Sequence, residues 1–264
     1  MKKVRSFNFL IILFIALLSS CGSSKKIAYL QDAESFKDTF PKELYDAHIK
    51  PKDLLTITVS TFDKEVSLPF NLVTPRAING TDMSITSTPT LQTYLVDNDG
   101  LIDFPVLGRI EVGGMTKKEV ENMLKEKLKV YLKEDPLVNV RMVNYKITVL
   151  GEVAKPSTFT VANEKINIYE ALAMAGDMTI YGKRENVKLV RENADGSKLV
   201  VVLNLNDKSL VSSPYFYLQQ NDVIYVEPNK AKARSSSYSN VTALWLSATS
   251  ILVSLASLVV TITK

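Results

Sequence analysis

The residue with the clearest chemical role in the sequence is Cys21, which ends the run Leu18-Ser19-Ser20-Cys21. Three basic residues near the start precede the almost wholly apolar stretch from Phe7 to Leu18, which is the order of a secretory signal peptide. A branched apolar residue and two small residues before a cysteine suit a lipoprotein signal peptidase, because small side chains fit its cleft. We therefore expect residues 1–20 to be removed and the Cys21 sulfur to carry diacylglycerol.

Other cysteine and histidine chemistry is not expected. Cys21 is the only cysteine, so an exported chain contains no internal disulfide. One cysteine and one histidine, His48, cannot supply the usual zinc ligands, and we expect no metal and no cofactor. Gly22-Ser23-Ser24 gives the acylated end a flexible tether to the membrane lipid, where each buried methylene contributes about 0.8 kcal/mol.

The carboxylates best spaced for acid-base chemistry are Asp97, Asp99 and Asp103. A pair of them could act on a glycosidic bond, which would make the protein an enzyme acting on sugars. They surround the turn sequence Asp97-Asn98-Asp99-Gly100, however, where aspartate is favoured because it hydrogen-bonds the local backbone. His48 has no nucleophile motif near it. We therefore predict no catalytic residues and no enzymatic activity.

The overall charge argues against nucleic-acid binding. The chain contains 32 Lys and Arg against 28 Asp and Glu, and without Lys2, Lys3 and Arg5 of the leader the balance is 29 against 28. Nucleic-acid affinity depends on an excess of basic residues that neutralise phosphates, and the mature chain has almost none.

The C-terminal segment contains no charged residue from Val241 to Thr263. A helix of this length, rising about 1.5 Å per residue, reaches the roughly 30 Å of a bilayer core, so we predict a transmembrane helix over residues 241–263. Trp245 stands one turn inside its start, where interfacial aromatic residues occur. Residues 230–240 are a basic and serine-rich linker before it.

Small residues, most of them with a hydroxyl group, recur along this segment at steps of four and three: Ala243, Ser247, Ser250, Ser254, Ser257 and Thr261. Such steps place them on one stripe of a helix. Two interpretations are open. In one, the segment is a single anchor whose serines bond their own helix backbone. In the other, which we favour, copies of the helix pack in a ring through this stripe, or the hydroxyl groups line a pore.

The residues between leader and last helix suffice for two small domains. After a tether and N-terminal arm over residues 21–45, residues 46–148 combine strands, such as the alternating Leu54–Ser60, with one helix that begins at the capping box Thr116–Glu119. Residues 137–150 look like one long strand. Residues 149–229 have a second capped helix and a hairpin signal at Ala194–Ser197. The fold class is α+β, with a grasp-like second domain.

Particular residues in both domains resemble known families. The stretch Ile49–Val59, with Pro51-Lys52-Asp53, is similar to the opening strand of the polysaccharide biosynthesis/export family, the Wza-like outer-membrane proteins. That family usually has Pro-Gly-Asp there. Asp99–Pro105, Leu107-Gly108 and the Thr116 helix resemble the rest of its domain.

The second domain resembles the soluble-ligand-binding β-grasp (SLBB) domain. The similarity lies in Val149–Val153, in the helix that ends at Ala175-Gly176, and in Leu218–Val226. Ser157 and Asn221 stand where that family favours glycine.

The resemblance implies a subunit of a homo-oligomeric ring that exports capsular or exopolysaccharide. In such proteins the terminal helices form a helical barrel through the outer membrane, and an inner-membrane polysaccharide co-polymerase kinase docks below. We accordingly expect an outer-membrane, lipid-anchored protein with most of its chain in the periplasm. The alternative is a periplasmic lipoprotein that binds a glycan or small ligand without transport, with Tyr215, Phe216 and Tyr217 as candidate pocket residues, although clustered aromatics are more often strand core.

Overall fold

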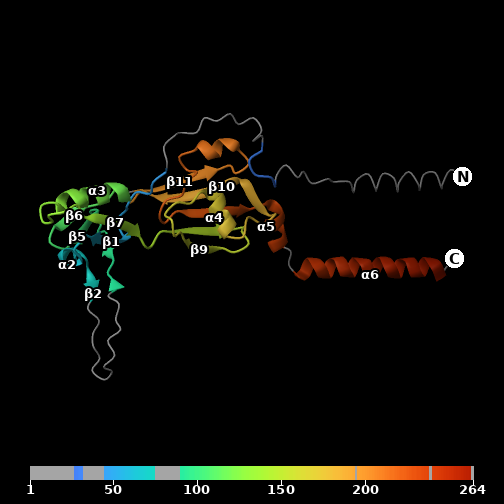
Figure 1. The fold of residues 1–264 in the computed structure, drawn as a ribbon. Helices are drawn as coiled ribbons and strands as arrows, with labels where there is room; N and C mark the ends of the chain where they lie inside the picture. Colours follow the sequence, from blue (N-terminus) through green and yellow to red (C-terminus); the bar gives the residue numbers. More distant parts are fainter. Residues whose placement is uncertain (1–26, 32–44, 75–89, 194, 238–239, 263–264) are drawn as a thin grey trace, which may run out of the picture.

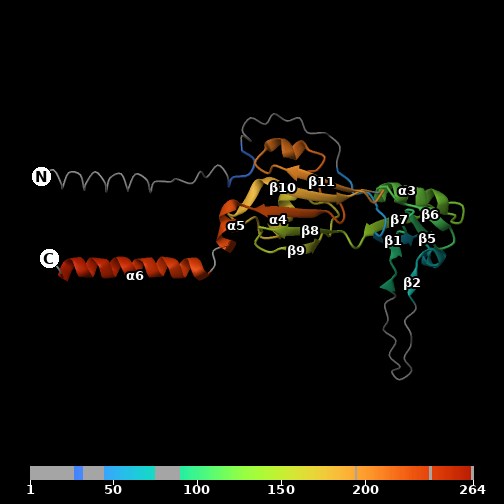
Figure 2. The same cartoon turned by 180° about the vertical axis from the view of Figure 1, so that it is seen from behind.

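The computed structural model describes residues 27–31, 45–74, 90–193, 195–237 and 240–262. The predicted signal peptide, Cys21 and most of the predicted N-terminal arm lie outside these residues. The described chain forms two domains that lie side by side, followed by two C-terminal helices (Figures 1 and 2). Both domains mix helices with sheets, as the predicted α+β fold requires.

The N-terminal domain is built on a three-stranded antiparallel sheet in the order β4-β1-β7. Its strands are β1 (Leu54–Ser60), β4 (Tyr94–Leu95) and β7 (Leu137–Met142). Leu55, Ile57 and Val59 of β1 are buried and alternate with more exposed residues, which confirms the predicted half-buried strand. The smaller elements are α2 (Lys64–Ser67), the 3-10 helix η3 (Leu68–Phe70), the pair β2 (Val73–Thr74) and β3 (Thr90–Leu91), and the hairpin of β5 (Leu101–Phe104) and β6 (Gly108–Glu111).

One helix, α3 (Lys117–Leu128), packs against β7. It begins at the predicted capping box, in which Thr116 Oγ1 accepts from the backbone N–H of Glu119 at 3.3 Å and Glu119 Oε2 accepts from that of Thr116 at 2.7 Å. The two contacts satisfy amides that the first helical turn leaves free. Three apolar residues one and two turns apart are completely buried beneath the helix: Val120, Leu124 and Leu128.

The C-terminal domain contains a five-stranded sheet in the order β11-β10-β12-β8-β9. β12 and β8 run parallel, and the other neighbouring strands run antiparallel. The helix α4 (Ile168–Met174) begins at a second capping box, formed by Asn167 and Glu170. The strands are β8 (Lys146–Gly151), β9 (Ser157–Thr160), β10 (Gly182–Glu192), β11 (Lys198–Leu203) and β12 (Val223–Pro228), with the 3-10 helix η4 (Lys208–Ser212) between β11 and β12.

The prediction of one long strand over residues 137–150 is wrong, because this segment divides between the two sheets. β7 ends at Met142, and β8 begins at Lys146. The buried residues change phase at this point, from Val138, Val140 and Met142 in one core to Tyr145, Ile147 and Val149 in the other. The chain therefore crosses from one domain to the other within three residues.

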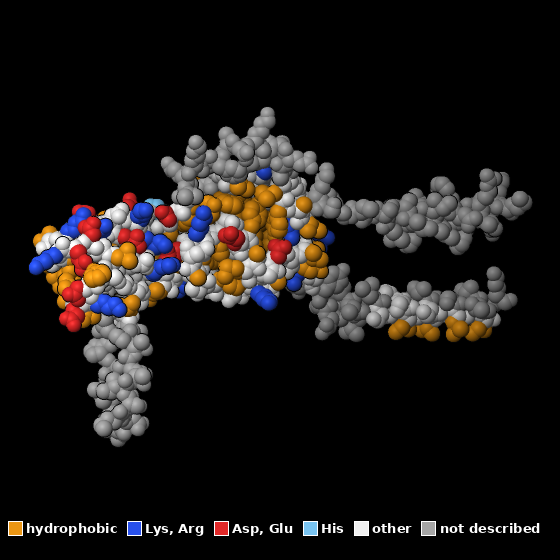
Figure 3. All heavy atoms as spheres, viewed as in Figure 1, with side chains coloured by type: hydrophobic (Ala, Val, Ile, Leu, Met, Phe, Trp, Pro, Cys, Tyr) orange, Lys and Arg blue, Asp and Glu red, His pale blue; other side chains and the backbone are white. Residues whose placement is uncertain are grey.

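Two helices follow β12, namely α5 (Lys230–Ser237) and α6 (Asn240–Ile262), and α6 extends away from the two domains (Figure 1). None of the helices in the described part of the chain is long and apolar enough to cross a membrane. The structure therefore does not support the transmembrane helix predicted over residues 241–263. The serines and threonines along the segment reduce its apolar character. The exposed apolar side chains described on α6 lie along one side of it (Figure 3).

Candidate functional site

The two domains meet at a junction that is held by aromatic residues from both. The Tyr45 ring, just before the N-terminal domain, stacks on the Tyr217 ring, with centroids 4.8 Å apart. The hydroxyl groups of Tyr45 and Tyr145 both donate to the carbonyl oxygen of Leu218, at 2.9 and 2.7 Å. The start of the N-terminal domain is thereby fixed to the loop that precedes β12.

A buried ion pair supports the same loop. Arg191, at the end of β10, is 5% exposed, and Asp222 is completely buried. The guanidinium donates to both oxygens of the Asp222 carboxylate, with Nη2 to Oδ2 at 2.7 Å and Nε to Oδ1 at 3.0 Å. Arg191 Nη2 also donates to the Tyr217 carbonyl, and Asp222 Oδ2 accepts from the backbone N–H of Gln219. The pair thus fixes the backbone of the loop as well as its charges.

A second ion pair joins the domains directly. Lys117, the first residue of α3, contacts the carboxylate of Glu164, which belongs to the C-terminal domain and is almost completely buried. Glu164 Oε1 also accepts from the backbone N–H of Met142, the last residue of β7, at 2.9 Å. One buried carboxylate therefore contacts both the helix and the sheet of the N-terminal domain.

Gln220 contacts the β7–β8 connection, where the chain passes from one domain to the other. Its Oε1 accepts from the backbone N–H of Lys146 at 2.7 Å, and its Nε2 donates to the Asn144 carbonyl at 2.8 Å. Asn144 in turn accepts from the backbone N–H of Leu54 at the start of β1. These bonds hold the β7–β8 connection against both domains.

Asp53, also at the junction, is completely buried. Its Oδ2 accepts from the backbone N–H of Lys50 at 2.8 Å, whereas its Oδ1 has no hydrogen-bond partner within the described residues. Burial disfavours the ionised form and raises the pKa of Asp53 to about 6. At neutral pH the folded protein therefore holds a buried carboxylate whose desolvation is only partly offset.

The Asp53→Asn variant is expected to lose a pH dependence of stability that the wild-type chain shows. Because the pKa of Asp53 is raised on folding, the folded state binds more protons between about pH 4 and pH 6, and stability falls as pH rises through that window. The loss amounts to about 2–3 kcal/mol at 1.36 kcal/mol per pKa unit. Urea denaturation at several pH values measures the free energy of unfolding. From pH 4 to pH 7, this free energy should fall by that amount in the wild type relative to the variant. If the unfolding free energies of variant and wild type change with pH in parallel, the raised pKa of Asp53 is contradicted.

Two turns at the junction require a left-handed backbone at a residue that is not glycine. Lys52 has φ of 72° and Asn221 has φ of 64°. These are the two positions before Asp53 and Asp222 where the resembled families favour glycine, the residue that adopts this conformation without steric cost. Lys52 and Asn221 thus place side chains at two turns whose left-handed backbone glycine adopts most readily.

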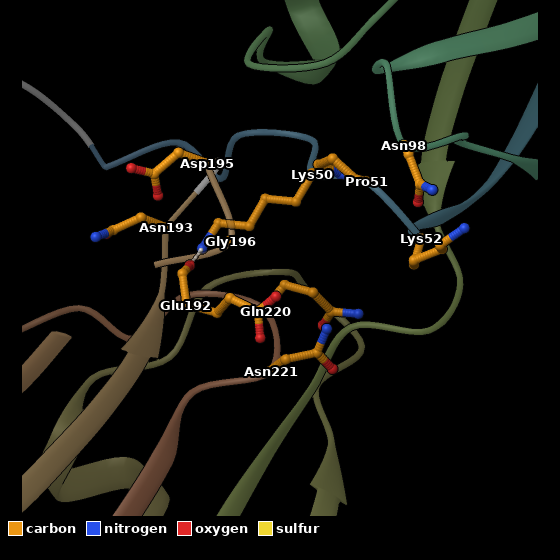
Figure 4. A pocket seen from close by; sticks show the side chains of 10 residues that line it. All are labelled: Lys50, Pro51, Lys52, Asn98, Glu192, Asn193, Asp195, Gly196, Gln220 and Asn221. Carbon is orange, nitrogen blue, oxygen red and sulfur yellow. Dashed lines mark hydrogen bonds between the residues drawn. The ribbon is translucent and has the colours of Figure 1, made fainter. Parts of the chain in front are cut away.

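A cavity of about 480 Å³ opens between these two turns and the β10–β11 hairpin, and we call it the junction cavity (Figure 4). The Lys50 side chain extends across it and donates from Nζ to the Glu192 carbonyl at 3.0 Å. Its lining comes from both domains: Lys50, Pro51, Lys52, Asn98, Glu192, Asn193, Asp195, Gly196, Gln220 and Asn221.

Comparison with known proteins decides which families the two domains represent. Residues 41–143 match the polysaccharide biosynthesis/export protein family, and residues 145–226 match the SLBB domain. The chain carries a polysaccharide export domain followed by an SLBB domain. The N-terminal domain is henceforth the export domain and the C-terminal domain the SLBB domain, and the resemblance seen in the sequence is confirmed.

Two curated relatives share part of this sequence. The EPS I polysaccharide export outer membrane protein EpsA of Ralstonia solanacearum is 29% identical over 147 residues, which are 54% of this chain and 38% of that protein. The protein of the same name from Ralstonia nicotianae is 32% identical over 112 residues, 41% of this chain and 29% of that protein. The chain thus matches less than two fifths of the length of either relative. Both relatives are named as export proteins and not as enzymes, in agreement with the predicted lack of catalysis.

Of the aspartates considered for catalysis, Asp97 has a structural role in the export domain. Asp97 Oδ1 accepts from the backbone N–H groups of Asp99 and Leu101, at 2.9 and 2.8 Å, and its carboxylate also pairs with Arg109. The bond from Leu101 contributes most to a pKa of Asp97 below its usual value. Of the aromatic residues considered for a ligand pocket, Tyr215 and Phe216 pack against the SLBB core and Tyr217 stacks on Tyr45, and none of the three lines the junction cavity.

The residues of the predicted helix stripe all fall within α6, whereas Cys21 lies outside the described residues. Ser247, Ser250 and Ser254 are exposed. Ser250 Oγ donates to the Ser247 carbonyl at 2.8 Å, and Ser254 Oγ donates to the Ser250 carbonyl at 2.9 Å. These are the bonds of the single-anchor interpretation, and packing in a ring stays a prediction. The junction itself was not predicted, because its residues come from segments far apart in the sequence.

Proposed function

We propose that the protein is a lipid-anchored subunit of an oligomeric outer-membrane channel that exports a capsular or extracellular polysaccharide. One observation carries the proposal: an export domain and an SLBB domain follow one another in one chain. The relatives that share this sequence are named polysaccharide export outer membrane proteins. Acylation at Cys21 would hold the chain at the membrane, with both domains in the periplasm.

The rigid junction suits a subunit of a closed ring. A ring closes only when every subunit presents its two contact surfaces at one fixed angle. Here the Lys117–Glu164 ion pair and the stacked rings of Tyr45 and Tyr217 each connect the two domains and so restrict the angle between them. In the proposed assembly the α6 helices of neighbouring subunits pack through the serine stripe, and an inner-membrane co-polymerase kinase delivers the polysaccharide from below.

The Cys21→Ser variant is expected to lose both acylation and export. Serine lacks the sulfur that receives diacylglycerol, and without acyl chains the chain loses its stable membrane anchor. Labelling cells with a radioactive fatty acid should show no label on the variant, and extracellular polysaccharide should fall to the level of a strain without the gene. Ser23→Ala in the tether is the matched control, and this variant should keep both acylation and export. Equal label on Cys21→Ser, or undiminished export by it, would contradict the lipoprotein channel.

A further inference from the structure

The junction cavity has the size and the fixed walls of a small-ligand site. Its volume of about 480 Å³ lies within the range of pockets that enclose small molecules. Gln220 is held by two backbone groups, Lys50 is held by the Glu192 carbonyl, and Asn193 Nδ2 donates to Ser197 Oγ at 3.0 Å. The walls are thus ordered before a ligand arrives, which lowers the entropic cost of binding.

Free polar groups face this cavity from both domains. Within the described residues, the side chains of Asn98 in the export domain and Asn221 in the SLBB domain make no hydrogen bond. Each amide group offers two donors and an acceptor. Figure 4 shows Asn98 beside Lys52 on one wall and Asn221 beside Gln220 on another. A ligand bonded to both amides would contact the two domains at once.

The lining chemistry defines the class of ligand. Pro51 is the only apolar side chain among the lining residues, which disfavours a lipid or an aromatic ligand. Lys50 and Lys52 are balanced by Glu192 and Asp195, so the cavity has no excess of charge for a phosphate or a polyanion. A lining that offers both hydrogen-bond donors and acceptors, without net charge, matches a molecule rich in hydroxyl groups.

We propose that the junction cavity binds a short uncharged saccharide segment, which bridges the export and SLBB domains. The choice of a saccharide among polyhydroxylated molecules rests on the proposed export function. The site lies beside the crossing of the chain at Asn144 and Gln220, so an occupied cavity would stiffen the connection between the domains. With no aromatic side chain in its lining to stack on a sugar ring, the site binds weakly and releases its ligand readily.

The test is a calorimetric titration of the full chain, purified in a detergent without a sugar headgroup. The probe is a set of neutral oligosaccharides of two to four residues, prepared by partial hydrolysis of the organism's own extracellular polysaccharide. Asn98→Ala removes one free amide. Asn221→Gly removes the other and suits the left-handed backbone at that position. Each variant should weaken binding about threefold to tenfold, the usual worth of one hydrogen bond.

Two controls make the result specific to the junction cavity. Asn163→Ala alters a smaller cavity of about 280 Å³ elsewhere in the SLBB domain and should leave the affinity unchanged. An oligogalacturonate of the same length should bind more weakly than the neutral probe. The proposal is overturned if no probe binds at millimolar concentration, or if the double variant Asn98→Ala/Asn221→Gly binds as the wild type does. If rings assemble and export normally without such binding, the saccharide site is refuted, whereas the proposed channel function is not.

Discussion

The Asp222→Asn variant is expected to lose about 3–5 kcal/mol of unfolding free energy, because it leaves Arg191 buried without its counter-charge. Arg191 is 5% exposed and cannot turn its guanidinium into water without breaking its bond to the Tyr217 carbonyl. The asparagine has the same shape, so the loss measures charge and not volume. Urea denaturation followed by circular dichroism gives the magnitude.

Two comparison variants separate the buried pair from ordinary surface charge. Asp103→Asn removes a carboxylate that is 89% exposed and lies 3.9 Å from Arg109, and it should cost at most about 1 kcal/mol. Arg191→Leu/Asp222→Leu removes both buried charges and should recover much of the stability lost in the single variant. A loss in Asp222→Asn no greater than that in Asp103→Asn would show that the pair does not support the SLBB loop.

The Gly151→Ala variant is expected to destabilise the SLBB domain by at least about 3 kcal/mol. Gly151 has φ of 92°, and a Cβ added there would lie 2.1 Å from the Val226 carbonyl oxygen. That oxygen accepts from the backbone N–H of Glu152 at 3.0 Å in the parallel pairing of β8 with β12. The methyl group would force these strands apart, adding a steric clash to the strain of a left-handed alanine. Thermal unfolding measures the effect.

Gly108→Ala is the matched control for this clash. Gly108 has φ of 73°, but nothing lies within 4 Å of the Cβ it would gain. Gly108→Ala should therefore lower the unfolding free energy only by the backbone strain of about 1–2 kcal/mol. If the two variants unfold at the same temperature, the close contact of β8 with β12 is not what requires glycine at position 151.

Local patterns in the sequence predicted the elements well where their causes are local. Both capping boxes form the expected bonds, and the hairpin signal near Gly196 joins β10 to β11. The strand predicted over Leu54–Ser60 has those bounds in the structure. In both capping boxes the side chain and the backbone N–H group that it satisfies lie only three residues apart in the chain.

The junction could not be predicted, because its contacts join residues far apart in the chain. Tyr45 meets Tyr217, and Lys117 meets Glu164, with no sequence pattern to connect them. One signal was present in the long apolar segment: the alternation slips by one residue at Val143, which is 46% exposed between two buried runs. Such a slip marks the place where a chain leaves one sheet and enters another.

Electron microscopy of the full chain, extracted in detergent from outer membranes, tests the channel most directly. We predict closed, ring-shaped particles of many copies around a central opening, with the export and SLBB domains of each subunit at one fixed angle. Monomers or dimers without an opening, from membranes that still export polysaccharide, would contradict it.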